Sequence, residues 1–310
     1  MLDTLFPFAR NWLDAMWVDV TRYAIFSVGL WLVLWVVLAI PLAGRKIRDS
    51  KPPARQLLTE FATSIRSIAI FSTVGLLTFG LFRAGWLPGP DIAKSWGPVW
   101  FWTSLVLMIV AHDAWFYWTH RLIHDRRLFR RFHRRHHRSN NPSPFTAYSF
   151  DLGEAFINGV FVPLWMIMVP TQWPVVGLFM LHQIVRNTIG HSGYELFPAR
   201  KDGRPLLPFL TTVTHHDLHH AQAGWNYGLY FTFWDKVMGT EHPEYLKRFA
   251  AVTARRADGS KTVMRKATYS PCEPCREDPT KAPIWQIRAQ RITHDQEKKE
   301  VVYDNAWLEI

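Results

Sequence analysis

Cysteine is nearly absent from this chain. Only Cys272 and Cys275 occur among 310 residues, and both lie late in the sequence. No disulfide framework can therefore support the main body, and no set of four thiolates is present to hold an iron–sulfur cluster. The sequence also lacks a glycine-rich phosphate-binding motif, a haem-binding cytochrome domain and an HExxH helix. These absences exclude several kinds of built-in redox chemistry and argue against a zinc-dependent hydrolase.

Charged side chains are missing from several long stretches. Residues 23–42 form a run of twenty without a charge, which is long enough to cross a hydrocarbon core of about 30 Å. A second run covers residues 67–82, and a third covers residues 99–111 and continues into His120. A signal peptide fits the first run poorly, because the run starts well inside the chain and is too long. The pattern predicts a multi-pass integral membrane protein.

The fourth apolar stretch, residues 155–181, contains 27 uncharged residues and is interrupted by Pro163 and by the segment 170–174. A single crossing would separate the later histidines from the earlier ones. A hairpin that turns at residues 170–174 returns the chain to the same side, with arms of about 11–15 residues each. We therefore expect a re-entrant or tilted hairpin here.

Basic residues set the expected orientation. They concentrate in residues 45–55 and 126–138, whereas the intervening loop has only Arg83 and Lys94 against Asp91. Lys and Arg gather on the cytoplasmic side of a membrane. The N-terminus is therefore expected outside, followed by three crossings. The histidine-rich region is expected on the cytoplasmic side of a bacterial inner membrane. The net charge of +11 then indicates contact with anionic lipid head groups rather than nucleic acid.

Histidine is the residue whose distribution is most informative, since most of the 14 are clustered. Three boxes of similar spacing stand out: His120 and His124; His133, His136 and His137; His216, His219 and His220. Residues four apart share a helix face, so each box directs two imidazoles to one point. Eight histidines exceed what one tetrahedral zinc uses, and they suit two metal ions with open positions.

Four further residues are candidates for the same site. His191 is a ninth possible ligand, and Asn187, one turn before it, could supply a carbonyl oxygen directly or through a water molecule. His112 lies two turns before His120 at the end of a membrane helix, where polar groups are costly and tend to be functional. His215 is placed as a possible additional ligand or a residue behind the ligands. No catalytic residue outside the metal centre is expected.

The boxes HRLIH, HRRHH and HDLHH, in this order, resemble those of the fatty acid hydroxylase and sterol desaturase superfamily of membrane di-iron enzymes. Supporting segments are Trp118–Arg121, Pro144–Tyr148, Glu154, His191–Gly193, Asn226–Gly228 and Phe233–Thr240. The resemblance implies an all-α integral membrane fold with about four transmembrane or re-entrant segments and a cytosolic histidine-rich helical cap. It also implies two iron ions held by His120, His124, His133, His136, His137, His191, His216, His219 and His220. Some members have a histidine at the position of Asn187.

The resemblance implies O2-dependent hydroxylation of a lipid-like substrate in the membrane. Desaturation of a sterol or another lipid on the same centre is the first alternative. A membrane protein that only stores or moves metal is the second. Transport would require polar residues along the crossing helices, and above His112 few such residues are expected. Electrons are expected from a separate reductase or small redox carrier, since the chain has no such domain of its own.

The character of the chain changes near residue 254, which divides it into a membrane domain, 1–253, and a polar tail, 254–310. Alternation in the last two segments of the tail predicts paired strands. The tail resembles the N-terminal repeats of a lipopolysaccharide-assembly outer-membrane protein, and a fusion or a reading-frame artefact is one interpretation. Two cysteines cannot complete a zinc site, so Cys272 and Cys275 are expected as a local disulfide or free thiols.

Overall fold

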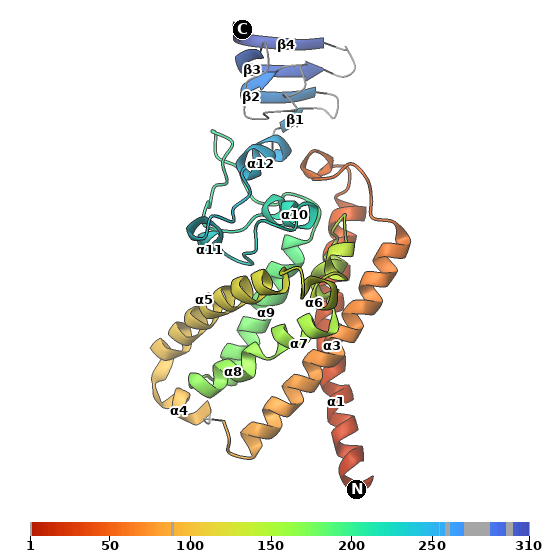
Figure 1. The fold of residues 1–310 in the computed structure, drawn as a ribbon, viewed down its shortest axis with the longest axis vertical. Helices are drawn as coiled ribbons and strands as arrows, with labels where there is room; N and C mark the ends of the chain where they lie inside the picture. The colour runs from red at the N-terminus through yellow and green to blue at the C-terminus, as the bar shows by residue number, and fades with distance from the viewer. Residues whose placement is uncertain are drawn as a thin grey trace.

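A computed structural model describes residues 2–87, 90–253, 255–257, 261–269, 286–295 and 300–309. Long helices form most of it, and a small sheet lies at the end opposite the N-terminus (Figure 1). The helices α10 (Val213–Ala221), α11 (Phe233–Val237) and α12 (Tyr245–Thr253) lie between the long helices and the sheet (Figure 1). This arrangement agrees with the predicted helical membrane protein with a helical cap.

Three helical segments are long and apolar enough to cross a membrane: Ala9–Val37, Ala54–Arg83 and Gly97–Ile123. The first comprises α1 (Leu2–Tyr23), α2 (Gly29–Leu32) and π-helical turns at Ala24–Val28 and Val33–Val37. The second is α3 (Ala54–Arg83) and the third is α5 (Gly97–Ile123), preceded by α4 (Pro90–Ser95). Their exposed faces carry large apolar side chains such as Leu13, Val36 and Leu77, as expected for contact with lipid.

The predicted start of the first span at residue 23 was wrong, because the helix continues far upstream of the uncharged run. The two charged residues that precede the uncharged run neutralise each other, since Arg22 Nη2 donates to Asp19 Oδ1 at 2.8 Å. Asp19 also accepts from Ser72 Oγ on α3 at 2.9 Å. Trp12 Nε1 donates to Thr73 Oγ1 at 2.9 Å, so polar contacts as well as apolar ones join α1 to α3.

The predicted hairpin is confirmed. Helices α7 (Leu152–Gly159) and α8 (Phe161–Met168) form the first arm, and α9 (Trp173–Gly190) forms the second. The turn is fastened by Trp165 Nε1, which donates to Thr171 Oγ1 at 2.8 Å, and by Trp100 Nε1, which donates to Pro170 O at 2.9 Å. Both arms exceed the expected length, since the first covers residues 152–168 and the second has 18 residues. The second arm continues through Arg186, whose guanidinium donates to the backbone carbonyls of Thr211 and Tyr230.

Short helical turns connect the long helices to the cap: α6 (Phe129–Phe132) and the 3-10 turns Ala43–Arg45, His136–Arg138 and Pro144–Tyr148. The last of these begins at Ser143, whose hydroxyl accepts from the Phe145 backbone N–H, while Thr146 Oγ1 accepts from the Ser143 backbone N–H. Helix α10 is capped by Thr212, whose hydroxyl accepts from the His215 backbone N–H. These caps fix where the chain turns beneath the histidine boxes.

The strand prediction for the tail is confirmed. Strand β3 (Gln286–Asp295) pairs antiparallel with β4 (Glu300–Glu309), with Ile292 opposite Tyr303. Strands β1 (Arg255–Ala257) and β2 (Lys261–Tyr269) extend this into a four-stranded sheet of order β1-β2-β3-β4. Cys272 and Cys275 lie outside the described residues, so the expectation about their thiols remains a prediction.

Candidate metal centre

The histidines converge into two groups near the cap-side ends of α5 and α9. The five-histidine cluster contains His120, His124, His133, His137 and His219, and the four-histidine cluster contains His136, His191, His216 and His220. Within each cluster one ring nitrogen per residue lies within 4.8 Å of those of all the others. These two clusters contain all nine residues that the sequence singled out as ligands.

The histidine boxes are divided between the two clusters. The i, i+4 pairs stay together: His133 and His137 lie in the five-histidine cluster, and His216 and His220 lie in the four-histidine cluster. The third member of each of these boxes, at i+3, lies in the other cluster. On α10 this agrees with the angle of about 100° between adjacent residues of a helix, whereas the box that begins at His133 lies on a turn and the 3-10 turn His136–Arg138. His136 and His219 are these members. The second and the third box thus each contribute histidines to both clusters.

Three rings are held at Nδ1 by backbone carbonyl oxygens. The pairs are His120 with Tyr227 O at 2.9 Å, His219 with Trp225 O at 2.6 Å and His191 with Asn187 O at 2.8 Å. A carbonyl oxygen only accepts, so Nδ1 carries the proton in each ring and the Nε2 lone pair is free. Such partners orient metal-binding histidines in proteins.

The free Nε2 atoms point at each other across short distances. His120 Nε2 lies 2.9 Å from His133 Nε2, His219 Nε2 lies 3.0 Å from His137 Nε2, and His191 Nε2 lies 2.8 Å from His216 Nε2. Nitrogens bound to one metal ion at about 2.1 Å each are separated by about these distances. The donor set, which is nitrogen throughout, therefore fits a transition-metal ion in each cluster and suits iron, copper or zinc by ligand type.

Burial keeps these imidazoles neutral. The pKa of His191 and that of His219 are lowered to about 4, and the pKa of His137 is lowered to about 2. The main cause in each case is removal of the ring from water. Burial also lowers the pKa of His133, His136, His216 and His220 far below the ordinary value. At neutral pH the lone pairs are thus available to a metal ion, which binds only the deprotonated nitrogen.

The metal-free protein is expected to lose stability on acidification. The pKa of His191 and of His219 is about 4 in the folded state, against about 6.5 in an unfolded chain, so the unfolded chain binds more protons between these values. Stability therefore falls as the pH falls through this window. Thermal unfolding of metal-free protein should give a Tm that declines steadily from about pH 7 to about pH 4.5. Replacing both histidines by Gln should make the decline shallower, and a Tm that rises on acidification would contradict this origin.

Glu154 reaches the five-histidine cluster from α7. Its carboxylate Oε2 lies 2.9 Å from His133 Nδ1, and both side chains are buried. A carboxylate behind a histidine fixes the ring and raises the basicity of the nitrogen that faces the metal. The sequence points to Glu154 through the family resemblance alone, and its spacing does not show which histidine it meets.

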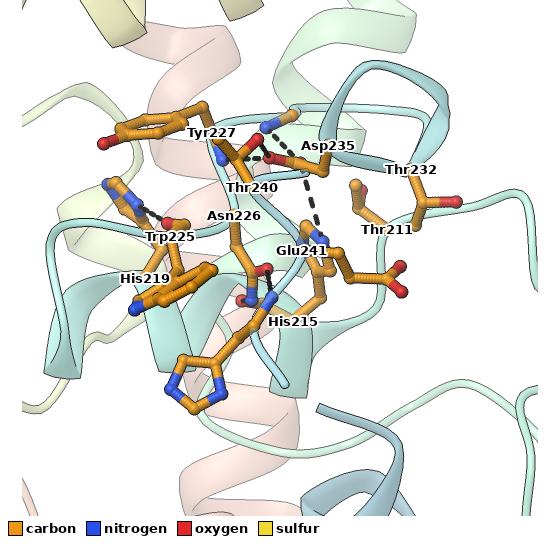
Figure 2. Close-up of polar contacts among 12 residues, drawn as sticks. Thr211, His215, His219, Trp225, Asn226, Tyr227, Thr232, Asp235, Thr240 and Glu241 are labelled. Carbon is orange, nitrogen blue, oxygen red and sulfur yellow. Dashed lines mark hydrogen bonds and ion pairs between the residues drawn. The ribbon is translucent and has the colours of Figure 1, made fainter. Parts of the chain in front are cut away.

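The loop between α10 and α11 is held by Asp235 (Figure 2). Its carboxylate accepts from the backbone N–H groups of Tyr227 and Gly228, each at 2.8 Å, and from Thr240 Oγ1 at 2.8 Å. Asn226 adopts a positive φ of 58°, and its amide donates to His215 O at 2.8 Å. Figure 2 shows His219 pointing at the Trp225 carbonyl of this loop. Asp235 thus fixes the backbone that orients two rings of the five-histidine cluster.

The three additional candidates lie outside both clusters. Asn187 holds its neighbours in place: its amide donates to Ala147 O at 2.7 Å and its backbone oxygen accepts from His191. His112 packs between Phe161 and Phe179, with ring centroids 4.7 and 5.0 Å away. His215 faces Asp235, with Nε2 3.6 Å from Oδ2. A direct ligand role for these three has no support from their geometry in the described part of the chain.

Comparison with known proteins gives matches over the segment that carries the boxes. The family model for fatty acid hydroxylase matches residues 105–240. A methylsterol monooxygenase of Aspergillus fumigatus is 30% identical over 227 residues, which cover 66% of this chain and 70% of that protein. The chain belongs to the fatty acid hydroxylase and sterol desaturase superfamily. Its predicted membership is thereby confirmed.

Other superfamily relatives carry different activities in their names. A lathosterol oxidase of Mus musculus is 30% identical over 155 residues, 49% of each chain. A Delta(7)-sterol 5(6)-desaturase of Gibberella zeae is 30% identical over 190 residues, 60% of this chain and 56% of that protein. The chain spans about half the length of the lathosterol oxidases that it matches. No solved structure matches the chain. These matches do not test the resemblance of the tail, which stays a prediction.

Proposed function

We propose that this chain is a membrane-bound di-iron oxygenase that hydroxylates a C–H bond of a lipid-like substrate. The observation that carries the proposal is the pair of buried, neutral histidine clusters at the cap-side ends of membrane-length helices. Membership of a superfamily whose named members include sterol oxidases and a methylsterol monooxygenase supports a lipid substrate. All nine clustered histidines are the proposed iron ligands.

The bound irons would supply the activation of O2. One oxygen atom enters the C–H bond, and the other leaves as water with two electrons and two protons from an external donor. The chain's own part is positional: Tyr227, Trp225 and Asn187 orient three imidazoles by their carbonyls, and the Glu154 carboxyl group lies 2.9 Å behind a fourth, that of His133. The apolar faces of α5 and α9 exclude water from the membrane side of the clusters.

Desaturation is the second candidate, and the match to a sterol desaturase favours keeping it. It would remove two hydrogens from the lipid and release both oxygen atoms as water, so the mass of the product distinguishes the two reactions. We also propose that the clusters lie on the cytoplasmic side of a bacterial inner membrane. The basic segments 45–55 and 126–138 lie at the same ends of the spans as the clusters. A separate reductase or small redox carrier would supply electrons.

Lipid mass spectrometry on cells with and without the gene tests the proposal. A lipid class heavier by one oxygen atom, seen with the intact protein and absent with His136→Ala, His137→Ala, is the expected result. A loss of two hydrogens would instead establish the desaturase. No lipid change, despite expression and supplied reductant, would refute both and favour a metal-binding role without catalysis.

The tail is proposed to be dispensable for catalysis. The last helix ends at Thr253, and the described strands begin at Arg255 and pair with one another. Deleting the residues after Arg256 is expected to leave the turnover number and the metal content unchanged, measured beside full-length protein in the same detergent. A truncated protein that is folded and metal-loaded but inactive would contradict this division at residue 254.

A further inference from the structure

A cavity of about 210 Å³ lies between the helices on the membrane side of the metal centre. Its walls come from α1, α3, α5, α7, α8 and α9 and are mostly apolar. They include Phe71, Val74, Phe161, Val176, Phe179 and Met180. Concave, mostly apolar pockets with a few convergent polar groups are the usual form of small-molecule sites. None of the nine clustered histidines lines this cavity.

The cavity has an apolar end and a polar end. Along α9 it is lined from Trp173 to Gln183, a distance of about 15 Å on a helix. Trp173 packs against Phe82 of α3, with ring centroids 5.6 Å apart, and marks the apolar end. Gln183 accepts from Tyr148 Oη at 2.7 Å and marks the polar end. Since α9 continues from Gln183 to His191, the polar end is the one nearer to the four-histidine cluster.

An ion pair within the first span lines the polar end. Arg22 donates to Asp19 at 2.8 Å, and both residues line the cavity. Ionisable groups inside membrane helices are costly and are retained mainly where they bind something. Arg22 Nε is buried and has no hydrogen-bond partner among the described residues.

Two amide side chains add further polar groups to the lining. Within the described part of the chain, the amide of Asn158 and the amide nitrogen of Gln183 make no hydrogen bond of their own. Thr78, on the wall formed by α3, is already satisfied, because its hydroxyl donates to Val74 O at 2.7 Å. The polar end thus offers unused donors and acceptors but no net charge.

We propose that this cavity binds a lipid with an uncharged hydrogen-bonding end group, such as a hydroxyl, placed between Arg22 and Gln183. The proposal rests on the proposed function in taking this lipid as the substrate. A hydroxyl both donates and accepts, so it satisfies the unused groups at the polar end. A carboxylate or sulfate meets an arginine whose charge Asp19 already neutralises, and the Asp19 carboxylate repels it. The carbons next to the end group then lie nearest to the metal centre, and the oxidised position is expected there.

Binding of matched neutral and charged lipids tests the end-group preference. The probes are radiolabelled 1-hexadecanol and hexadecanoate, and cholesterol and cholesteryl sulfate, added to purified metal-loaded full-length protein in nanodiscs. At least one alcohol is expected to bind about tenfold more tightly than its charged counterpart. In Asp19→Asn the arginine charge is no longer neutralised, so the charged lipid should gain about tenfold. The matched control is Asp14→Asn, an exposed position on the same helix that does not line the cavity.

Filling the cavity tests its position independently of charge. A Cβ added at Gly75, which lines the cavity, meets nothing within 4 Å, and the same holds at Gly80, which does not line it. Gly75→Leu is expected to weaken binding of both alcohols by about tenfold, whereas Gly80→Leu on the same helix should not. Unchanged binding in Gly75→Leu, an unchanged preference in Asp19→Asn, or no saturable binding of either alcohol would overturn the proposal.

Turnover separates this inference from the proposed function. If both variants change binding as expected but no lipid is oxidised, the cavity assignment stands and the oxygenase proposal fails. If wild-type protein oxidises a lipid and neither variant alters binding or the position of oxidation, the oxygenase stands and the cavity assignment fails. Fragment masses of the product locate the new oxygen and show whether it lies beside the end group.

Discussion

Alanine in place of His216 is expected to lower the metal content from about two ions to about one per chain and to reduce turnover by about 100-fold or more. His216 Nε2 lies 2.8 Å from His191 Nε2 inside the four-histidine cluster, so its removal opens that cluster alone. His137→Ala should do the same to the five-histidine cluster, where His137 Nε2 lies 3.0 Å from His219 Nε2. Inductively coupled plasma mass spectrometry for all transition metals, beside an activity assay, measures both effects.

The control for these two variants is His294→Ala. His294 lies on β3 of the tail, opposite Val301, and belongs to neither cluster. It should leave the metal content and the turnover unchanged. The double variant His137→Ala, His216→Ala should bind almost no metal. If either single variant lost both ions while remaining folded, the two clusters would not be independent sites.

Asparagine in place of Asp235 is expected to weaken metal binding by the five-histidine cluster about 10- to 100-fold and to spare the four-histidine cluster. The substitution keeps the size of the side chain but turns one acceptor oxygen into a donor. That donor then faces a backbone N–H of Tyr227 or Gly228, which both lie 2.8 Å from the carboxylate. Each buried donor left unsatisfied costs about 1–3 kcal/mol, so the loop should shift together with its carbonyls.

The selectivity of this effect follows from which rings the loop holds. Trp225 O and Tyr227 O orient His219 and His120, both of which belong to the five-histidine cluster. Metal titration with an absorbance or calorimetric readout should therefore show one weakened site and one unchanged site. Asp202→Asn is the matched control, because Asp202 accepts a backbone N–H in an exposed turn far along the chain from the loop. Equal weakening of both sites would show that Asp235 acts on the general fold.

Much of the fold was readable from the sequence because membrane spans and paired prolines leave strong signals. The hairpin at residues 170–174 followed from two prolines and the need to bring the histidines together, and the structure places the turn there. Hydropathy alone excludes Asp19 and Arg22 from the first span, whereas the structure includes both in the membrane-length segment Ala9–Val37. An ion pair cancels two charges only when the partners meet, and hydropathy counts each residue separately.

The candidate site was also predictable from the sequence only in part. Spacing identified the histidines, because i, i+4 pairs are a local property of the helix. The sorting of His136 and His219 into opposite clusters depends on how the 3-10 turn His136–Arg138 and helix α10 face each other, which local spacing does not contain. The roles of Asp235 and Glu154 depend on backbone atoms and rings far away in sequence. Such contacts are set by tertiary packing, and no pattern in a single sequence records them.

The long separations within the clusters have a consequence for how the protein matures. His137 meets His219, 82 positions later in the chain, and His120 is oriented by the carbonyl of Tyr227, 107 positions later. A ribosome needs about 4 to 20 s to add that many residues. During this time the early boxes lack the later histidines of both clusters, so neither ion can be fully coordinated on a nascent chain. Metal uptake is therefore a late step of biogenesis, and a quality-control protease that acts on incomplete chains would encounter them before they can hold a metal ion.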